Sequence, residues 1–169
     1  MNGSLALRLG STFQGIDVES GGNGRLLVGV PGGSVVPVLT FLKEEGYDYL
    51  QLISCVDWID RGVFELVYLL SYYSEDEIGG AVGRREVLLK TTVPRGRASV
   101  PSATGVFAIA EPHEREIHEL FGVHFEGHPR LTPLFLEREY EIPPFRKDFD
   151  TKQYVADVFD SVPPVEEEG

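Results

Sequence analysis

Three apolar segments that follow one another closely set the strongest limit on how this chain can fold. They cover residues 49–58, 63–72 and 85–94. In the second segment Phe64, Leu66 and Tyr68 fall on one face at a period of two, which is typical of a β-strand. The link IDRG between the first two is short enough for a hairpin, and residues 74–83 form an acidic, glycine-bearing surface loop before the third. The three segments therefore predict an antiparallel meander.

A helix is predicted over residues 35–45, between a short strand at residues 25–30 and the meander. Its apolar residues recur at helical spacing, at Val35, Val38, Leu39 and Leu42. Ser34 can accept a hydrogen bond from the free amides at its start, and Gly46 can close it in a left-handed turn. A helix followed by a meander indicates the α+β class, with an antiparallel sheet of about four strands and helices packed on it.

Two further helices are predicted after the third strand. Ser102 can cap a short one over residues 102–110, and residues 111–122 form the other. In the second, Pro112 suits the first helical position and Gly122 suits the exit. Its apolar face, Ile117 with Leu120 and Phe121, is expected to pack inward.

The character of the sequence changes at Arg130. The remaining residues include five prolines and no long periodic segment, yet they carry too many apolar side chains for a purely disordered segment. Such a segment is best explained by apolar pockets on another surface, which we expect to belong to another chain. The division that follows is an N-terminal segment over 1–24, a globular α+β domain over 25–129 and an extended, partner-binding tail over 130–169.

Composition excludes several classes of partner and site. The formal net charge of -12 repels polyanions, so nucleic acid and a bare anionic membrane are poor partners. No run approaches the roughly 20 apolar residues that cross a bilayer, and the N-terminus lacks a signal-like pattern, so we expect a cytoplasmic protein that reaches a membrane only through a complex. Cys55 is the only cysteine, which excludes an intrachain disulfide and a four-thiolate zinc or iron–sulfur site built from this chain alone. We expect Cys55 to be a small buried thiol, and Asp57 and Asp60 to serve the turn around Trp58.

All four histidines lie between residues 111 and 129, in EPHEREIHELFGVHFEGHP. His113 and His118 are five residues apart, so on a helix they point roughly 140° away from each other and cannot form a zincin pair. His124 and His128 are four apart, but the glycines and the proline around them do not favour a continuous helix. A zinc site assembled from helix and loop ligands stays open as an alternative.

Charge pairing explains much of the same stretch. Glu111 with Arg115, Glu114 with His118, and Arg115 with Glu119 are each four residues apart, the spacing at which side chains meet on a helix. Exposed pairs contribute only a few tenths of a kcal/mol each and would not require this density. Arg115 among these carboxylates therefore indicates a network that fixes the arginine in place, as at a buried contact between chains.

Three motifs give the chain a resemblance to a known family. They are FELVYLL (64–70), VPSATGVFAIAEPHEREIHELFGVHFEGHP (100–129) and PPFRKDF (143–149). In this order they resemble the C subunit of the proton-pumping NADH-quinone oxidoreductase, respiratory complex I, and the related subunit of membrane-bound nickel–iron hydrogenases. The chain departs from the family pattern at Glu119, where Asp is usual, at Phe145, where Leu is usual, and in RLTPLFL after Gly127-His128-Pro129. The third departure makes the hydrogenase branch a serious alternative.

The resemblance implies a cofactor-free structural subunit of the peripheral arm, peripheral to the inner (plasma) membrane. Its partners would be the large quinone-site (or hydrogenase-like) subunit and the small iron–sulfur subunit. Iron–sulfur clusters, and a flavin or a nickel–iron centre, are expected in those partners. The positions that carry the motif are expected to serve the fold and the interface with the partner: Glu114, Arg115, Glu116, Gly122, Gly127, His128, Pro129, Phe145, Arg146, Lys147 and Asp148.

Two functions of other classes stay open beside this one. The histidine cluster could belong to a small zinc hydrolase, and the acidic chain could be a stand-alone interaction domain whose tail has no dedicated large partner. Within the resemblance, Pro143-Pro144 would stiffen the tail, and Arg146, Lys147 and Asp148 would form charged hydrogen bonds with the partner.

Overall fold

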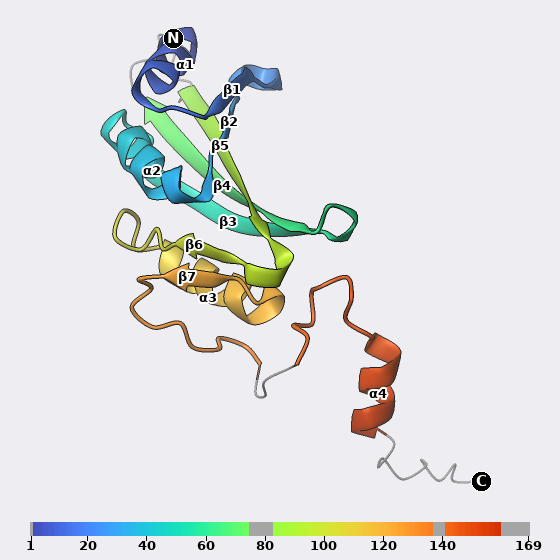
Figure 1. Ribbon diagram of the computed structural model, residues 1–169. Helices are drawn as coiled ribbons and strands as arrows, with labels where there is room; N and C mark the ends of the chain where they lie inside the picture. The colour runs from blue at the N-terminus through green and yellow to red at the C-terminus, as the bar shows by residue number, and fades with distance from the viewer. Residues whose placement is uncertain (1, 75–82, 137–140, 160–169) are drawn as a thin grey trace, which may run out of the picture.

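A five-stranded sheet forms the centre of the computed structural model, which describes residues 2–74, 83–136 and 141–159 (Figure 1). The strand order is β1-β2-β5-β4-β3. Neighbours are antiparallel except β2 and β5, which run parallel. The strands are β1 (Asp17–Ser20), β2 (Leu26–Gly29), β3 (Tyr49–Trp58), β4 (Val63–Ser74) and β5 (Gly83–Pro94). The predicted α+β class is therefore confirmed.

The predicted meander is β3, β4 and β5. The 3-10 turn η3 (Ile59–Arg61) and Gly62, in the left-handed region at φ 65°, close the β3–β4 hairpin. β4 pairs along its whole length with β5, from Val63 opposite Pro94 to Ser74 opposite Gly83. Of the acidic loop predicted over residues 74–83, Ser74 and Gly83 belong to the strands β4 and β5, and residues 75–82 lie outside the described part of the chain. β1 was not predicted because its sequence, DVES, has no apolar alternation to reveal it.

Helix α2 (Val35–Glu44) matches the helix predicted at residues 35–45. Gly46 follows it at φ +92°, and the Tyr47 amide donates to the Leu42 carbonyl at 2.9 Å. The capping role expected for Ser34 was wrong: its side chain makes no cap hydrogen bond. The 3-10 turn η2 (Gly32–Ser34) already leads into the helix with Ser34 in a helical conformation, so its hydroxyl is not placed over the first amides.

Helix α1 (Asn2–Thr12) lies at the N-terminus and packs against the same core as α2. Leu5 and Leu9 are buried and belong to the same apolar cluster as Leu39 and Leu42 of α2. Helix α1 therefore contributes to the core of the domain. Together the buried face of the sheet and the helices form one apolar cluster, and each fully buried aliphatic or aromatic side chain in it adds about 1.5–3 kcal/mol to the free energy of unfolding.

Helix α3 (Ala110–Phe121) confirms the helix predicted at residues 111–122, and Ile117 and Leu120 face the core as expected. Gly122 ends it in the left-handed region, donating its amide to His118 O. A small second sheet pairs β6 (Ser99–Pro101) in parallel with β7 (His124–Glu126), and η4 (Arg95–Arg97) connects β5 to β6.

The short helix predicted over residues 102–110 is wrong. The chain there makes isolated turns, with the Val106 and Phe107 amides donating to the Ala103 carbonyl at 2.9 Å. The physical reason is Glu114, whose carboxylate binds the Ser102 hydroxyl and the Ala103 amide from α3. These two groups are therefore held by a side chain of another helix and do not begin a helix of their own.

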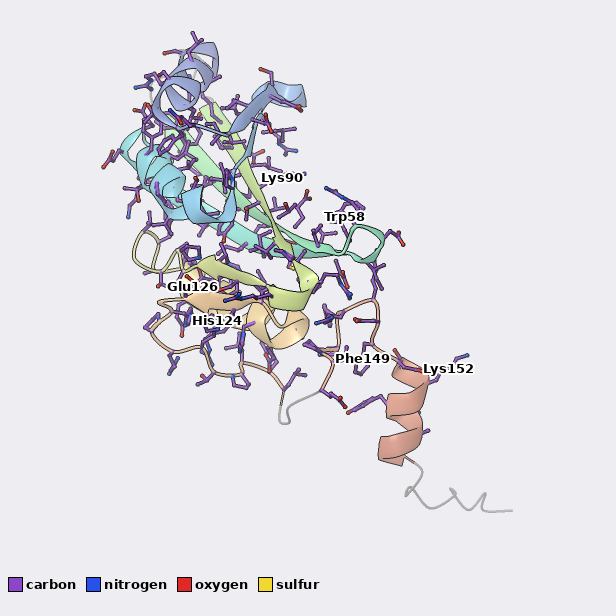
Figure 2. All side chains as sticks on the ribbon, in the orientation of Figure 1. Trp58, Lys90, His124, Glu126, Phe149 and Lys152 are labelled. Atoms are coloured by element: carbon purple, nitrogen blue, oxygen red, sulfur yellow. The ribbon has the colours of Figure 1, made fainter. Side chains whose placement is uncertain are left out.

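The tail leaves the domain after β7 and runs past α3 to the β3–β4 hairpin before helix α4 (Thr151–Phe159), which projects away from the sheet (Figure 1). Figure 2 shows Lys152 on this helix, at a distance from the sheet strands that carry Lys90 and Trp58. The sequence predicted no regular element in the tail, so helix α4 was missed. None of the helices over the described residues is long and apolar enough to cross a membrane.

Candidate partner interface

Arg115 of α3 holds the first part of the tail by its backbone. Only 9% of this residue is exposed, and it donates from Nε to Thr132 O at 2.9 Å and from Nη2 to Pro133 O at 2.8 Å. Glu111 accepts from Nη1 at 3.4 Å. The network predicted around Arg115 exists, and its partners here are the backbone of the chain's own tail and Glu111.

Glu119 lies one turn further along the same face of α3 and binds the next three tail residues. Its carboxylate accepts from the amides of Leu134 at 3.1 Å, Phe135 at 3.0 Å and Leu136 at 2.5 Å. Partial burial of Glu119 acts to raise its pKa, but these three amides and nearby Arg115 outweigh it, so the pKa lies below its ordinary value. We call Arg115, Glu119 and residues 132–136 the helix anchor.

Glu114 points the other way, into the domain, and is fully buried. It accepts from Ser102 Oγ at 2.6 Å and from the Ala103 amide at 2.7 Å. The predicted pairing with His118 is therefore wrong; His118 Nδ1 donates instead to Val123 O at 2.9 Å. Burial raises the pKa of Glu114, with the two hydrogen bonds and His128 acting against it. Glu114 joins the 102–105 turn to α3.

His128 holds the turn that begins the tail. Its Nε2 donates to Glu111 O at 3.1 Å, and its Nδ1 accepts from the Arg130 amide at 3.0 Å, so the two partners define the Nε2–H tautomer. Gly127 before it lies at φ +80°, and Pro129 follows it. Both ring nitrogens are thus used within the chain, and no group of three or more potential metal ligands comes together among the described residues.

A second attachment lies at the end of the β3–β4 hairpin. Asp57 is only 4% exposed and accepts from Arg95 Nε at 2.7 Å and Arg95 Nη2 at 3.0 Å. The same carboxylate accepts from the Lys147 backbone amide at 2.8 Å. The role expected for Asp57 in its own turn was wrong. The signal was present in the sequence, since Asp57 falls on the inward register of β3 with Ile53, where a carboxylate requires a partner.

Asp148 completes this attachment. It accepts from Arg146 at 3.1 Å and from Arg95 Nη2 at 2.8 Å. The hydrogen bond from Arg146, and then the one from Arg95, lower the pKa of Asp148 to about 2. Both guanidinium groups also lie over the Phe64 ring, at 5.4 Å for Arg95 and 5.6 Å for Arg146. We call Asp57, Arg95 and residues 145–148 the hairpin anchor.

Phe145, the first residue of the hairpin anchor, also contacts the C-terminal end of α3. Its amide donates to Leu120 O at 3.0 Å, and its ring meets Phe121 edge to face at a centroid distance of 5.9 Å. Pro143 packs so closely on Gly122 that a Cβ there would lie 3.1 Å from the proline ring. Gly122 therefore ends α3 and also leaves room for the tail.

Glu116 and Cys55 lie beside Phe145, in a groove of about 200 Å³ between α3 and β3. Burial, and then Asp57, raise the pKa of the Cys55 thiol to about 12, so it stays protonated, as expected of a small structural thiol.

The apolar side chains of the tail are exposed although its backbone is bound. Phe135 is 65% exposed and Phe145 60%, and Ile142 and Val155 are also exposed. A run of exposed apolar side chains along one segment is typical of a surface that contacts another protein.

Comparison with known proteins identifies the family. Residues 28–155 match the family model described as respiratory-chain NADH dehydrogenase, 30 Kd subunit. The chain belongs to this family. The C subunit of the NADH-quinone oxidoreductase from Neorickettsia sennetsu is 31% identical over 140 residues, covering 82% of this chain and 71% of that protein. The C subunit from Moorella thermoacetica is 33% identical over 139 residues, covering 81% and 87%.

Two solved structures are also similar. A chain in the structure of the membrane-bound sulfane sulfur reductase, an archaeal respiratory membrane complex, is 26% identical with a TM-score of 0.80, covering 98% of this chain and 95% of that chain. The trypsin-resistant fragment (1–134) of Nqo5 is 28% identical with a TM-score of 0.62, covering 78% and 100%. The resemblance stated from the sequence is confirmed, and this family member is a subunit of a multi-subunit respiratory complex.

Proposed function

We propose that this chain is a structural subunit of the peripheral arm of an NADH-quinone oxidoreductase and carries no redox cofactor of its own. It would bind the large quinone-site subunit, beside the small iron–sulfur subunit, and reach the inner face of the plasma membrane only through the complex. The observation that carries the proposal is the tail, whose backbone is bound by the domain while its apolar side chains face outward.

The helix anchor and the hairpin anchor explain how the tail is held while its side chains stay exposed. Arg115, Glu119 and Asp57 bind backbone groups of residues 132–136 and 147, so they fix the path of the tail without covering its side chains. Presenting side chains on a fixed backbone lowers the conformational entropy lost when a partner binds them. Exposed aromatic residues such as Phe135 and Phe145 are also the residue type enriched at binding hot spots.

The absence of a cofactor is part of the proposal and rests on the residues present. The single cysteine has a raised pKa, and both nitrogens of His128 are bound within the chain. The electron carriers of the complex, iron–sulfur clusters with a flavin or a nickel–iron centre, would then lie in partner subunits. Arg146, Asp148 and the backbone amide of Lys147 would support the tail from within, which differs from the direct partner contacts expected from the sequence for Arg146 and Asp148.

A second candidate is the equivalent subunit of a membrane-bound, energy-converting nickel–iron hydrogenase type of complex. The match to the sulfane sulfur reductase complex favours it, because that match covers 98% of this chain and so includes the tail. The RLTPLFL stretch after Pro129 agrees with this branch as well, and in this structure it is the stretch bound by the helix anchor.

Co-purification from the native membrane tests the proposal. The Phe135→Asp, Phe145→Asp variant should leave the domain folded, because both rings are mostly exposed, but most of the tagged chain should separate from its complex. Leu7→Asp is the matched control, since Leu7 is an exposed apolar residue on α1, and it should co-purify normally. Normal co-purification of the double variant would refute the proposal. Mass spectrometry of the neighbouring chains decides between the two complexes.

A further inference from the structure

The end of the β3–β4 hairpin carries an exposed tryptophan between two cations. Trp58 is 40% exposed, and Figure 2 shows it at the projecting hairpin. The Arg61 guanidinium lies 5.8 Å from its ring centroid, and the Lys147 ammonium lies 6.0 Å from it. Arg61 belongs to the hairpin turn and Lys147 to the tail, so the group forms only when the tail is bound at the hairpin anchor. We call Trp58, Arg61 and Lys147 the tryptophan clamp.

The clamp is locally cationic on a strongly acidic chain. Among the described residues neither Arg61 nor Lys147 is in an ion pair. The neighbouring charges of the hairpin anchor neutralise one another, two arginines against two aspartates. Of the other charges nearby, Asp60 lies in the same turn and Asp150 comes three residues after Lys147. Arg97 follows Arg95, whose amide donates to Gly62 O at 3.0 Å. A net positive charge therefore remains here, although the whole chain carries -12.

An apolar stripe leads along β3 to the clamp. Leu52, Val56 and Trp58 are all exposed, and they share the outward register of the strand with Ser54. Ile59 adds a further exposed apolar side chain at the turn. The surface thus offers apolar contacts along a strand and two unpaired cations at its end.

We propose that this surface binds an acidic–apolar segment of a partner protein, with its carboxylates at Arg61 and Lys147 and its apolar side chains along Leu52 and Val56. This is a second contact, apart from the apolar side chains of the tail, and it rests on the proposed function in that it needs a partner subunit. Charge decides the class of partner. A short peptide segment with carboxylates interacts mainly with the cations within about 10 Å of it. An extended anionic bilayer or nucleic acid also faces the acidic remainder of the chain and is repelled by it.

The test uses the intact complex and a salt gradient. Arg61→Gln with Lys147→Gln should lower the salt concentration that releases half of the chain by about twofold, because the charges that attract the partner are gone. Trp58→Ala should act in the same direction. Arg8→Gln with Lys90→Gln is the control for net charge: it also removes two positive charges, from ion pairs elsewhere on the chain, and should leave the release point unchanged.

Two further measurements separate the possible outcomes. A photo-crosslinker at Ile59 should attach to a segment of a partner subunit that contains Asp or Glu; attachment to lipid, to a second copy or to nothing would overturn the proposal. Binding of the purified chain to phosphatidylglycerol vesicles that disappears in the Arg61→Gln, Lys147→Gln variant would assign the surface to lipid and also overturn it. If the Phe135→Asp, Phe145→Asp variant leaves the complex but the clamp variant has an unchanged release point, the proposed function stands and the clamp is wrong.

Discussion

The globular domain and the tail use the same kinds of residue in opposite ways. In the domain, strand backbones bind each other and apolar side chains such as Phe64, Leu66 and Tyr68 are completely buried. In the tail, backbone groups bind charged side chains of the domain, while Phe135 and Phe145 face outward. Apolar burial therefore stabilises the domain, whereas the contacts of the tail fix its path along the domain and leave its apolar side chains exposed. This difference predicts that variants separate into those that unfold the domain and those that release the tail.

The largest effect is expected for Gly46→Ala, which concerns the domain alone. Gly46 lies at φ +92°, and an added Cβ would lie 2.7 Å from a carbon of the Tyr72 ring. Backbone strain and overpacking together should lower the free energy of unfolding by roughly 3 kcal/mol, measured by urea denaturation. Gly3→Ala in α1, where a Cβ meets nothing within 4 Å, should lose no stability. Equal stability of wild type and Gly46→Ala would contradict the packing described.

Asp57→Ala should affect both regions. The substitution removes the acceptor of Arg95 and of the Lys147 amide at a nearly buried position. We expect the free energy of unfolding to fall by roughly 2–3 kcal/mol, because Arg95 is then paired only with Asp148. Amide hydrogen exchange at residues 145–149 should also accelerate. Asp57→Asn keeps one acceptor oxygen and should lose less. If Asp57→Ala lowered the free energy of unfolding but left amide hydrogen exchange at residues 145–149 unchanged, Asp57 would not hold the tail.

The sequence predicted the domain better than the tail for a physical reason. The meander and helices α2 and α3 were predictable because burial imposes a period of two or 3.6 on their apolar residues. The contacts of Arg115 and Glu119 were not, because their partners are backbone groups some 15 or more residues away, which have no sequence signature. A spacing of four found the pair of Glu111 with Arg115, but it could not show that Glu114 points into the core.

Helix α4 and strand β1 were missed because burial imposes no strong apolar period on either element. β1 is polar and is held by backbone pairing with β2, and α4 stands on a tail with no core to impose a strong apolar pattern. Of the site, the motif residues of α3 and the Gly127-His128-Pro129 turn could be found from the sequence. Arg95 could not, because only the fold brings it to Asp57 and Asp148.

Glu114 gives a pH test of the buried carboxylate on α3. Burial raises its pKa, so between the unfolded value of about 4.3 and the raised value the folded state binds more protons than the unfolded state. Stability must then fall as pH rises through this window. Glu114→Gln removes the titration and should flatten the profile of the free energy of unfolding, measured by urea denaturation at a series of pH values. Glu116→Gln on the same helix is the control, and parallel profiles for wild type and Glu114→Gln would contradict the assignment.

Glu119→Gln should release part of the tail and leave the domain stable. It removes the charge that accepts three amides, so hydrogen exchange at residues 134–136 should accelerate roughly tenfold, which corresponds to about 1.4 kcal/mol of local opening. The free energy of unfolding of the domain should change by less than about 0.5 kcal/mol. Exposed Glu44 on α2 provides the control Glu44→Gln. If Glu119→Gln lowered the free energy of unfolding of the domain but left amide exchange at residues 134–136 unchanged, Glu119 would stabilise the domain and not the tail.

The smallest effect is expected for Asp148→Asn at the edge of the hairpin anchor. Its lowered pKa of about 2 means that the stabilising charge is fully present above the unfolded value of about 3.9 and is lost as pH falls toward 2. Its side chain is 35% exposed, so solvent screening should limit the effect on the free energy of unfolding to less than about 0.5 kcal/mol at pH 7. Exchange at residues 145–149 should nevertheless accelerate, and this difference between variant and wild type should shrink as pH falls toward 2, where about half of wild-type Asp148 has lost its charge. An equal effect at pH 7 and pH 2 would show that shape, and not charge, binds this part of the tail to the domain.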